Sequence, residues 1–464
     1  MAPAIVEVLR KGPWDISVMF VITFLESFVI FNIYGILMWI LREDCGFSDT
    51  VSGVLFGVFS ICVGVYGALM GPVVDYIKVR KAMLFEILCC IAGQAIMSAT
   101  LHPVAVCVAL FLPMALGISG IHTIVAVAIQ RYVRESHRTT VFTTRYAIMN
   151  IGAVPSLFLV DYVRLHVSIS FMPLWSFFLA CNTALQLVVL VITFLGVHDI
   201  EVTDDDDGND DDRWQTQVVG NTTKSTGELK KQVKDVLNSA NFWNLVLLSW
   251  VLVGAASILM YDHSLYPLYM KRAPFPVEHP ENTEFMMMLA LDPAIVVVMC
   301  FIVGEVITRF AMDRFWVIFV GSIINGVSPL FMIPTQYWGV FVYITTMAVG
   351  EGIWSPVYDK YVCEFTTKGS EGTFFGLAAL TTVASRFIMG FASGFLLNIF
   401  CPAQGQCIEG WWIWLIAALG GVVTPLGMLA TQRCTHIKPK ETYIELEEVP
   451  EGTTIDQEED EDHQ

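Results

Sequence analysis

The chain has 464 residues and a mean hydropathy of +0.62, and only 15% of its residues are charged. A soluble domain carries about 25% charged residues, so this composition excludes a soluble globular protein and favours a chain embedded in a bilayer. The net charge of −18 arises in two segments, because residues 199–212 hold nine acids and residues 441–464 hold eleven. We interpret both segments as disordered and solvated, the alternative being a partner that recognises acidic groups.

Apolar segments of membrane-spanning length recur along the chain. A transmembrane helix needs about 20 mostly apolar residues. In chain order, the segments that meet this requirement are 17–41, 51–70, 82–101, 103–128, 141–162, 171–196, 242–265, 285–307, 315–333, 337–358, 372–398 and 411–431. They predict an all-α membrane protein of twelve transmembrane helices in two six-helix bundles.

A long polar stretch divides the predicted spans six and six, which is the outline of a major facilitator protein. The predicted domains are an amino-terminal six-helix bundle over 1–196, an acidic cytoplasmic linker over 197–240, a carboxy-terminal six-helix bundle over 241–433 and an acidic disordered tail over 434–464.

Lys and Arg residues are concentrated in the loops on one side of the predicted spans, where thirteen of them lie against four on the other side. This bias sets the orientation of a membrane protein and predicts that both termini and the linker are cytoplasmic. We expect a multi-pass protein of the plasma membrane or an endolysosomal membrane. The loop that contains Cys401 and Cys407 then faces outward, where the two cysteines could form a disulfide.

Ionisable side chains inside the spans are costly and mark functional sites. Glu26 and Glu351 lie too deep in the first and tenth spans to reach an interface, so we expect each to be protonated, paired or turned toward a wet cavity. Further ionisable groups at depth are His122, Asp262, His263, Asp292 and Arg386. His122 has an alternative interpretation as a hydrogen-bonded packing residue.

Three other charged residues lie nearer the ends of their spans. Glu86 and Glu305 are expected to reach the cytoplasmic interface, and Arg145 is expected to snorkel or to pair with a loop acid. Helix-breaking residues also lie at depth: Pro155, Pro293 and Pro356 interrupt spans five, eight and ten. The pairs Gly117/Gly120 and Gly390/Gly394 should let helix backbones approach closely.

The loop after the second span contains Gly71 and Asp75, then Lys78, Arg80 and Lys81. This pattern resembles the loop signature of major facilitators, in which a Gly and an Asp precede a basic cluster. It predicts a gating role for Asp75, Arg80 and Lys81, through a charge latch in the closed state.

Several stretches resemble the proton-dependent oligopeptide transporter (peptide/nitrate) family. They are the first-span run from Glu26 through Tyr34-Gly35, the loop Gly46-Phe47-Ser48-Asp49, Gly120-Ile121-His122-Thr123, Tyr146-x-x-x-Asn150-x-Gly152, Asp292-Pro293, and Gly350-Glu351 with Ser355-Pro356. The family's first glutamate is present as Glu26, and the glutamate that meets a peptide's amino terminus is present as Glu351.

The departures from that family concern its charged machinery. Val29, Ile30 and His122 stand where the family has its second Glu, its Arg and its Lys, which handle the proton and the substrate carboxylate. The resemblance therefore implies that the amine-side anchor is present and the carboxylate clamp is missing. Either the substrate differs, for example by a cationic group, or His122 or Arg386 serves in a rebuilt site.

We therefore predict a secondary active transporter, not an enzyme, that moves a small polar solute such as a peptide or amino acid by alternating access, with protons as coupling ions. The predicted substrate-binding residues are Glu26, Tyr34, His122, Asn150, Asp262, Glu351, Trp354 and Arg386, and the predicted proton-coupling residues are Glu26, His122 and Glu351. No cofactor, metal or nucleic acid is expected, and no nucleotide-binding motif occurs.

The competing hypothesis is a facilitator-fold receptor or scaffold that no longer transports and acts through its cytoplasmic acidic segments. Tyr443-Ile444-Glu445-Leu446 in the tail matches a Tyr-x-x-Φ pattern and predicts a sorting adaptor as a partner, although chance explains so short a pattern equally well.

Overall fold

A computed structural model describes residues 2–202, 214–218, 226–275, 284–310, 312–365, 387–403, 407 and 409–436. The protein is a helical membrane protein whose described spans form two bundles, as the predicted fold requires. Ten helices and one bent pair among the described residues are each long and apolar enough to cross a bilayer. The helix Phe387–Phe400 is the described part of the remaining predicted span, 372–398.

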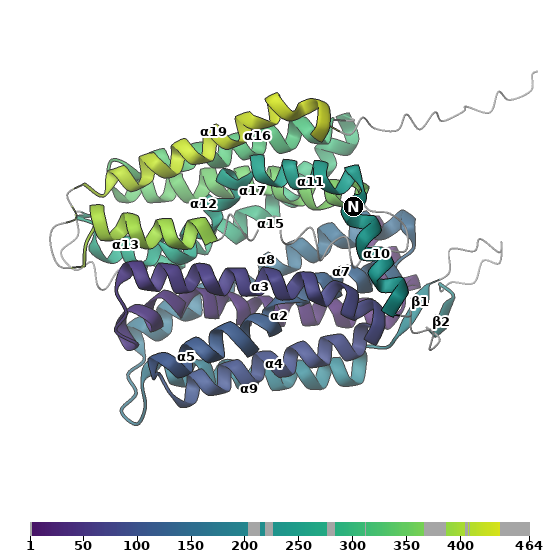
Figure 1. Ribbon diagram of the computed structural model, residues 1–464, viewed down its shortest axis with the longest axis horizontal. Coiled ribbons are helices and arrows are strands. Elements are labelled where there is room, and N and C mark those ends of the chain that lie inside the picture. The colour runs from purple at the N-terminus through teal and green to yellow at the C-terminus, as the bar shows by residue number, and fades with distance from the viewer. Residues whose placement is uncertain are drawn as a thin grey trace, which may run out of the picture.

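The amino-terminal bundle follows a short helix α1 (Ala2–Lys11) and occupies the lower half of Figure 1. Its spans are α2 (Trp14–Trp39) with the π-turn η1 (Ile40–Asp44), α3 (Asp49–Ile77), α4 (Val79–Ala99), a segmented fourth span of α5 (Pro103–Ala109), η2 (Leu110–Met114), α6 (Ala115–Ser119) and α7 (Ile121–Tyr132), then α8 (Glu135–His166) and α9 (Leu174–Gly196).

The carboxy-terminal bundle lies above it in the same view. It contains α11 (Ala240–Val251), α12 (Val253–Ser264), α13 (Tyr266–Arg272), α14 (Phe285–Leu289), α15 (Leu291–Phe310), α16 (Arg314–Val327) with the 3-10 turn η4 (Ser328–Met332), α17 (Tyr337–Phe365), the helix Phe387–Phe400 and α19 (Trp411–Thr435).

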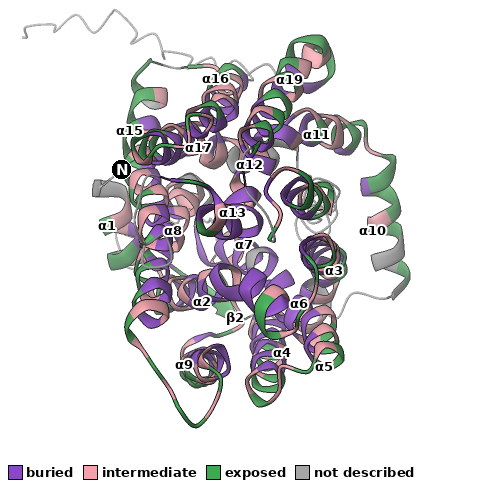
Figure 2. Ribbon diagram, turned by 90° about the vertical axis from the view of Figure 1, so that its left-hand side faces the viewer, coloured by how far each residue is buried: buried purple, intermediate pink, exposed green. Residues whose placement is uncertain are grey.

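We call the end of the bundles where α2 ends and α3 begins the outer end, following the predicted orientation. Figure 2 is a view onto this end, with buried residues gathered in the middle and exposed residues around the rim. Large apolar side chains such as Leu195 and Phe395 are exposed on these helices. Exposed apolar surface of this extent is stable against lipid, which agrees with a polytopic membrane protein.

The described part of the linker forms regular structure, and residues 200–202 of the acidic run predicted to be disordered belong to it. Strand β1 (Ile200–Val202) pairs antiparallel with β2 (Thr216–Val218), and α10 (Thr226–Asn238) follows. Buried Trp214 anchors this segment, because its backbone N–H donates to the Lys11 carbonyl at 2.8 Å. Residues 203–213 lie outside the described residues, as does the predicted acidic tail from 437 onward.

Helix breaks agree in part with the predictions. Pro155 and Pro356 lie inside the continuous helices α8 and α17, so the prediction that they interrupt their spans is wrong. Pro293 instead lies in the first turn of α15, just after the break that separates it from α14, because the first turn of a helix tolerates a missing N–H. The largest break was not predicted: α11 and α12 bend by 56° at Leu252.

Glycines bring the two bundles into close contact along α3. A side chain at Gly53 would overlap the backbone of Gly390 and Gly394 on the helix Phe387–Phe400. The close approach predicted for the pair Gly390/Gly394 is therefore confirmed. Gly117 packs on Cys90 and Gly120 on Glu86, both of α4. These two glycines therefore let the fourth span approach α4 closely within the amino-terminal bundle.

Candidate functional site

One polar contact joins the middles of the two bundles. The Tyr146 hydroxyl of α8 donates to Glu351 Oε1 of α17 at 2.8 Å and lies 2.9 Å from Ser355 Oγ, one turn further along α17. The Tyr146 ring packs against Val296, Cys300 and Ala348, which form an apolar cluster of α15 and α17. The apolar cluster fixes the ring, so its hydroxyl holds the Glu351 carboxyl at the bundle interface.

Two further carboxyl groups of the carboxy-terminal bundle lie within electrostatic range of Glu351. Asp262 of α12 is buried and accepts a hydrogen bond from the Tyr343 hydroxyl at 2.7 Å. Asp292, in the first turn of α15, has a buried oxygen, Oδ1, without a hydrogen-bond partner. None of these three carboxyls has a basic partner among the described residues. Such a site favours a positively charged ligand.

Aromatic rings from the amino-terminal bundle cover the residue next to Asp262. Tyr34 of α2 stacks on the His263 ring with 5.5 Å between the centroids, and Phe31 meets the same ring edge-on at 5.7 Å. His263 is buried and its Nδ1 has no hydrogen-bond partner. The acidic cluster is thus adjacent to rings that can stack on an organic cation or on a side chain.

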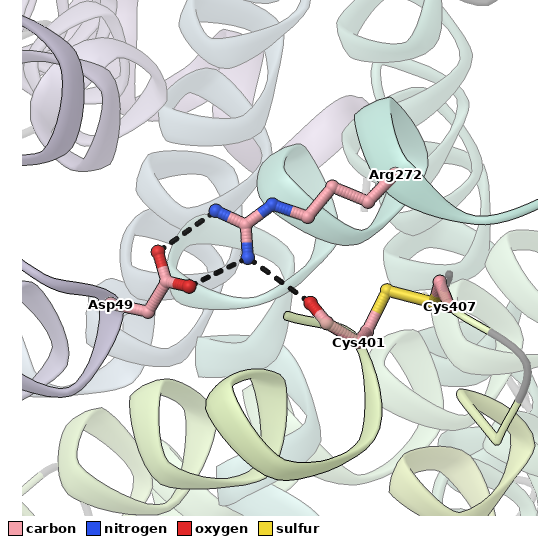
Figure 3. Close-up of a disulfide and its surroundings, with 4 residues drawn as sticks. All are labelled: Asp49, Arg272, Cys401 and Cys407. Carbon is pink, nitrogen blue, oxygen red and sulfur yellow. Dashed lines mark hydrogen bonds and ion pairs between the residues drawn. A yellow bond between two sulfur atoms is a disulfide. The ribbon is translucent and has the colours of Figure 1, made fainter. Parts of the chain in front are cut away.

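A charge cluster joins the outer ends of the bundles (Figure 3). Asp49, at the start of α3, accepts two hydrogen bonds from Arg272 of α13, each at 2.8 Å. Arg42 adds a third at 2.8 Å. Arg272 also donates to the Cys401 carbonyl at 3.2 Å, and Cys401 is disulfide-bonded to Cys407. This cluster, which we call the outer latch, holds three segments of the chain together.

Three other contacts close the same end. Asp161 of α8 accepts the backbone N–H of Met287 in α14 at 2.7 Å and pairs with Arg164 at 2.9 Å. The Arg164 guanidinium lies 4.3 Å from the centre of the Phe285 ring. Lys271 and Glu43 form a more exposed ion pair between the bundles. The outer ends are therefore held together by both charged and apolar contacts.

Comparison with known proteins agrees with this architecture. The sequence model described as Major Facilitator Superfamily matches residues 19–391, most of the chain. The chain belongs to the major facilitator superfamily. It is therefore a membrane transporter, and members of this superfamily are not enzymes. No curated protein sequence matches this facilitator.

Solved structures of one transporter family share the fold of this facilitator. A POT family transporter in complex with 5-aminolevulinic acid is 13% identical, with a TM-score of 0.70 over 92% of this chain and 98% of that one. A bacterial homologue of the human drug peptide transporters PepT1 and PepT2 is 15% identical, with a TM-score of 0.65 over 90% and 98% of the two chains. The peptide transporter POT in complex with sulfate is 13% identical, with a TM-score of 0.70 over 91% and 95%. The resemblance stated from the sequence is thus confirmed for the fold.

The structure brings some of the predicted site residues of the facilitator together. Glu351, Asp262 and Tyr34 lie around the bundle interface, as described above. Asn150 is buried one turn from Tyr146, but its side chain donates back to the Tyr146 carbonyl at 3.0 Å. Trp354 is buried in an apolar cluster of the carboxy-terminal bundle, and its indole N–H has no partner.

Other predicted residues lie elsewhere. Glu26 is buried inside the amino-terminal bundle, where its Oε2 accepts a hydrogen bond from Gln186 of α9 at 2.9 Å. It does not meet Asp262 or Glu351 across the interface. The His122 side chain, Arg386 and the adaptor pattern Tyr443–Leu446 lie outside the described residues.

The predicted gating residues show contacts within one bundle. The Arg80 N–H donates to Asp199 at 3.1 Å, and its guanidinium binds the Phe194 carbonyl at the end of α9. Lys81 is exposed, and the Asp75 side chain lies outside the described residues. The described ion pairs between the bundles join Asp49 to Arg272 and Glu43 to Lys271, at the opposite end. In the sequence, Arg42 and Arg272 are two of the four basic residues on the predicted outer side, and nothing there pairs them with Asp49.

Proposed function

We propose that this facilitator is a secondary active transporter for a small polar solute that carries a protonated amine, such as a peptide or an amino acid, and that protons drive it. The observation that carries the proposal is the cluster of Asp262, Asp292 and Glu351, which includes a direct hydrogen bond to Tyr146 of the other bundle. In this proposal the three carboxyls bind the amine, and Tyr34 and His263 stack on the apolar part of the solute.

Electrostatics supports an amine as the recognised group. Buried carboxylates are stable when they are paired with a cation or protonated, and a substrate ammonium group supplies the missing charge. The positions of the family's Arg and Lys hold Ile30 and His122, so the site is richer in acid than in permanent positive charge. The comparison structures with 5-aminolevulinic acid and with peptide-like ligands contain molecules with amino groups, which agrees with this chemistry.

The contacts between the bundles support alternating access as the mechanism. Opening the site toward the outer end requires the outer latch to separate, because Asp49 belongs to the amino-terminal bundle and Arg272 to the carboxy-terminal one. A solute that bridges Glu351 and the amino-terminal bundle would replace the Tyr146 contact during this rocking motion. We place both termini in the cytoplasm and the protein in the plasma membrane or an endolysosomal membrane.

Exchange in proteoliposomes tests the proposal. Vesicles loaded with an unlabelled dipeptide take up the labelled dipeptide without any ion gradient if the carrier recognises it. A panel of competitors would contain dipeptides, basic and neutral amino acids, nitrate, and the same dipeptide with an acetylated amino terminus. We expect competition by one amine-bearing class and none by the acetylated dipeptide.

A matched pair of variants locates the binding group. Glu351→Gln should abolish exchange, whereas Glu305→Gln, on an exposed position of α15, should leave it unchanged. If no solute of the panel is exchanged by the folded wild-type protein, the proposed substrate class is wrong and the receptor hypothesis gains support.

A further inference from the structure

A second acidic site lies inside the amino-terminal bundle. Glu86 of α4 is fully buried, and neither of its carboxyl oxygens has a hydrogen-bond partner. This corrects the prediction that Glu86 reaches the cytoplasmic interface. The carboxyl is packed against Gly120, at the interruption between α6 and α7, where any side chain would overlap it. The fourth span is therefore shaped around the Glu86 carboxyl.

Glu26 of α2 lies within electrostatic range of Glu86. Its Oε2 accepts from Gln186 of α9, but its Oε1 has no partner, and neither has the Gln186 carbonyl oxygen. With the two oxygens of Glu86, four buried acceptors thus lack a donor in this region. The other described titratable groups in range of Glu86 are the thiols of Cys89 and Cys90 on its own helix, and no described base is among them.

This second site is separate from the acidic cluster at the bundle interface. Glu86 belongs to α4, which packs against α9 on the side of the amino-terminal bundle away from the carboxy-terminal bundle, as Figures 1 and 2 both show. Glu26 is about 12 Å along α2 from Tyr34, at 1.5 Å per residue. The same helix thus connects the second site to the aromatic residues of the proposed substrate site.

Buried carboxyl oxygens without donors favour a bound cation, and the chemistry favours a proton. Two carboxyls within electrostatic range of each other in an apolar interior do not readily both ionise, so at least one of them favours a bound proton. A metal ion would need more ligands, and no group of three or more His, Cys, Asp and Glu residues among those the structure describes could hold one. A protonated carboxyl also gains a donor, for which the unpartnered Gln186 oxygen is an acceptor.

We propose that Glu26 and Glu86, with Gln186, form the site that binds the coupling proton, apart from the Glu351 cluster that binds the solute. This inference rests on the proposed function. One proton binds a carboxylate oxygen of the pair while the carrier is open to one side and leaves when it is open to the other. The hydrogen bonding between α2 and α9 changes with its occupancy, and α2 transmits this change to Tyr34 and His263.

Comparing exchange with accumulation tests the assignment. In the proteoliposomes, Glu86→Gln and Glu26→Gln should each retain exchange without a gradient but lose accumulation driven by an inside-alkaline pH gradient. Glu351→Gln should lose both activities, and Glu305→Gln neither. The assignment would be overturned if either Glu86→Gln or Glu26→Gln accumulated solute under a pH gradient to the wild-type level. Loss of exchange in both folded variants would also overturn it. Accumulation driven by a sodium gradient alone would overturn the choice of a proton.

An independent readout needs no transport. Infrared difference spectra of the reconstituted protein, recorded over a pH titration, should contain the carbonyl band of a buried protonated carboxyl. One component of this band should be lost in Glu86→Gln, while the carboxyls of the Glu351 cluster retain theirs, and Glu305→Gln should retain the whole band. An unchanged band in Glu86→Gln would contradict the proposed proton site, whether or not the true solute has been found. If the wild-type protein exchanges no solute of the panel but its spectra contain the band, only the proposed function is refuted.

Discussion

The outer latch provides the most quantitative prediction. Asp49→Asn removes the charge that accepts three hydrogen bonds at 2.8 Å from Arg272 and Arg42, at a site where the Asp49 side chain is only 3% exposed. Breaking a buried ion pair on one side costs about 3–5 kcal/mol. Because Arg42 is partly exposed, we take the lower value, about 3 kcal/mol, which corresponds to roughly a 100-fold shift of the equilibrium away from the state with a closed outer end.

Distances between spin labels across the outer end measure this shift. Val104 and Trp338 are exposed at the outer ends of α5 and α17, one in each bundle. We would label V104C and W338C in a background that retains only Cys401 and Cys407, so that the disulfide is preserved. The variant Asp49→Asn should populate longer distances than the parent protein.

A matched control separates the latch from a general loss of charge. Glu43→Gln removes the other ion pair at this end, whose partners are each nearly half exposed. An exposed pair contributes about 0.2–1 kcal/mol, so the shift should be at most about fivefold. Equal distance distributions for Asp49→Asn and its parent, or an equally large change in Glu43→Gln, would refute the reasoning.

Three other changes have expected outcomes. Gly53→Val should prevent the close packing of α3 on the helix bearing Gly390 and destabilise the closed outer end by about 1–3 kcal/mol. The distance between the labels at positions 104 and 338 should then lengthen, and an unchanged distance would disprove the close approach. Tyr146→Phe removes the hydrogen bond at Glu351 that the solute must replace, and it should strengthen amine binding by up to roughly tenfold in competition assays, while weakened binding would contradict the proposed replacement. Replacing Cys401 and Cys407 together with serine should lower stability by about 2 kcal/mol, and reductant should lower the melting temperature of the wild type but not of this variant.

The spans were predictable because the bilayer imposes one requirement, a long apolar helix, on each of them. The bend at Leu252 was not, since no proline marks it. Its cause is tertiary: the Gly254 N–H donates to Thr424 Oγ1 of α19 at 2.9 Å, and Gly254 packs on the backbone of Gly420. A single sequence does not reveal a partner 170 residues away.

The candidate site was predictable as residue types but not as groupings. Their depth in the spans predicted functional roles for Glu26, Asp262 and Glu351. Only the three-dimensional arrangement separates Glu26, which lies inside the amino-terminal bundle, from Asp262 and Glu351 in the carboxy-terminal bundle. Glu86 was misjudged because its position in α4 suggests an interface, whereas Gly120 opens a space for it between α6 and α7. The helix face that a carboxyl occupies depends on neighbours that periodicity cannot identify.

Equilibrium binding to the purified protein tests the central claim most directly. A labelled dipeptide or amino acid found by the exchange panel would be titrated against its N-acetylated counterpart on wild type, Glu351→Gln and Glu86→Gln. The account predicts that wild type and Glu86→Gln bind the free amine, that Glu351→Gln does not, and that acetylation abolishes competition. Equal affinity for the amine and the acetylated form, or undiminished binding by Glu351→Gln, would contradict it.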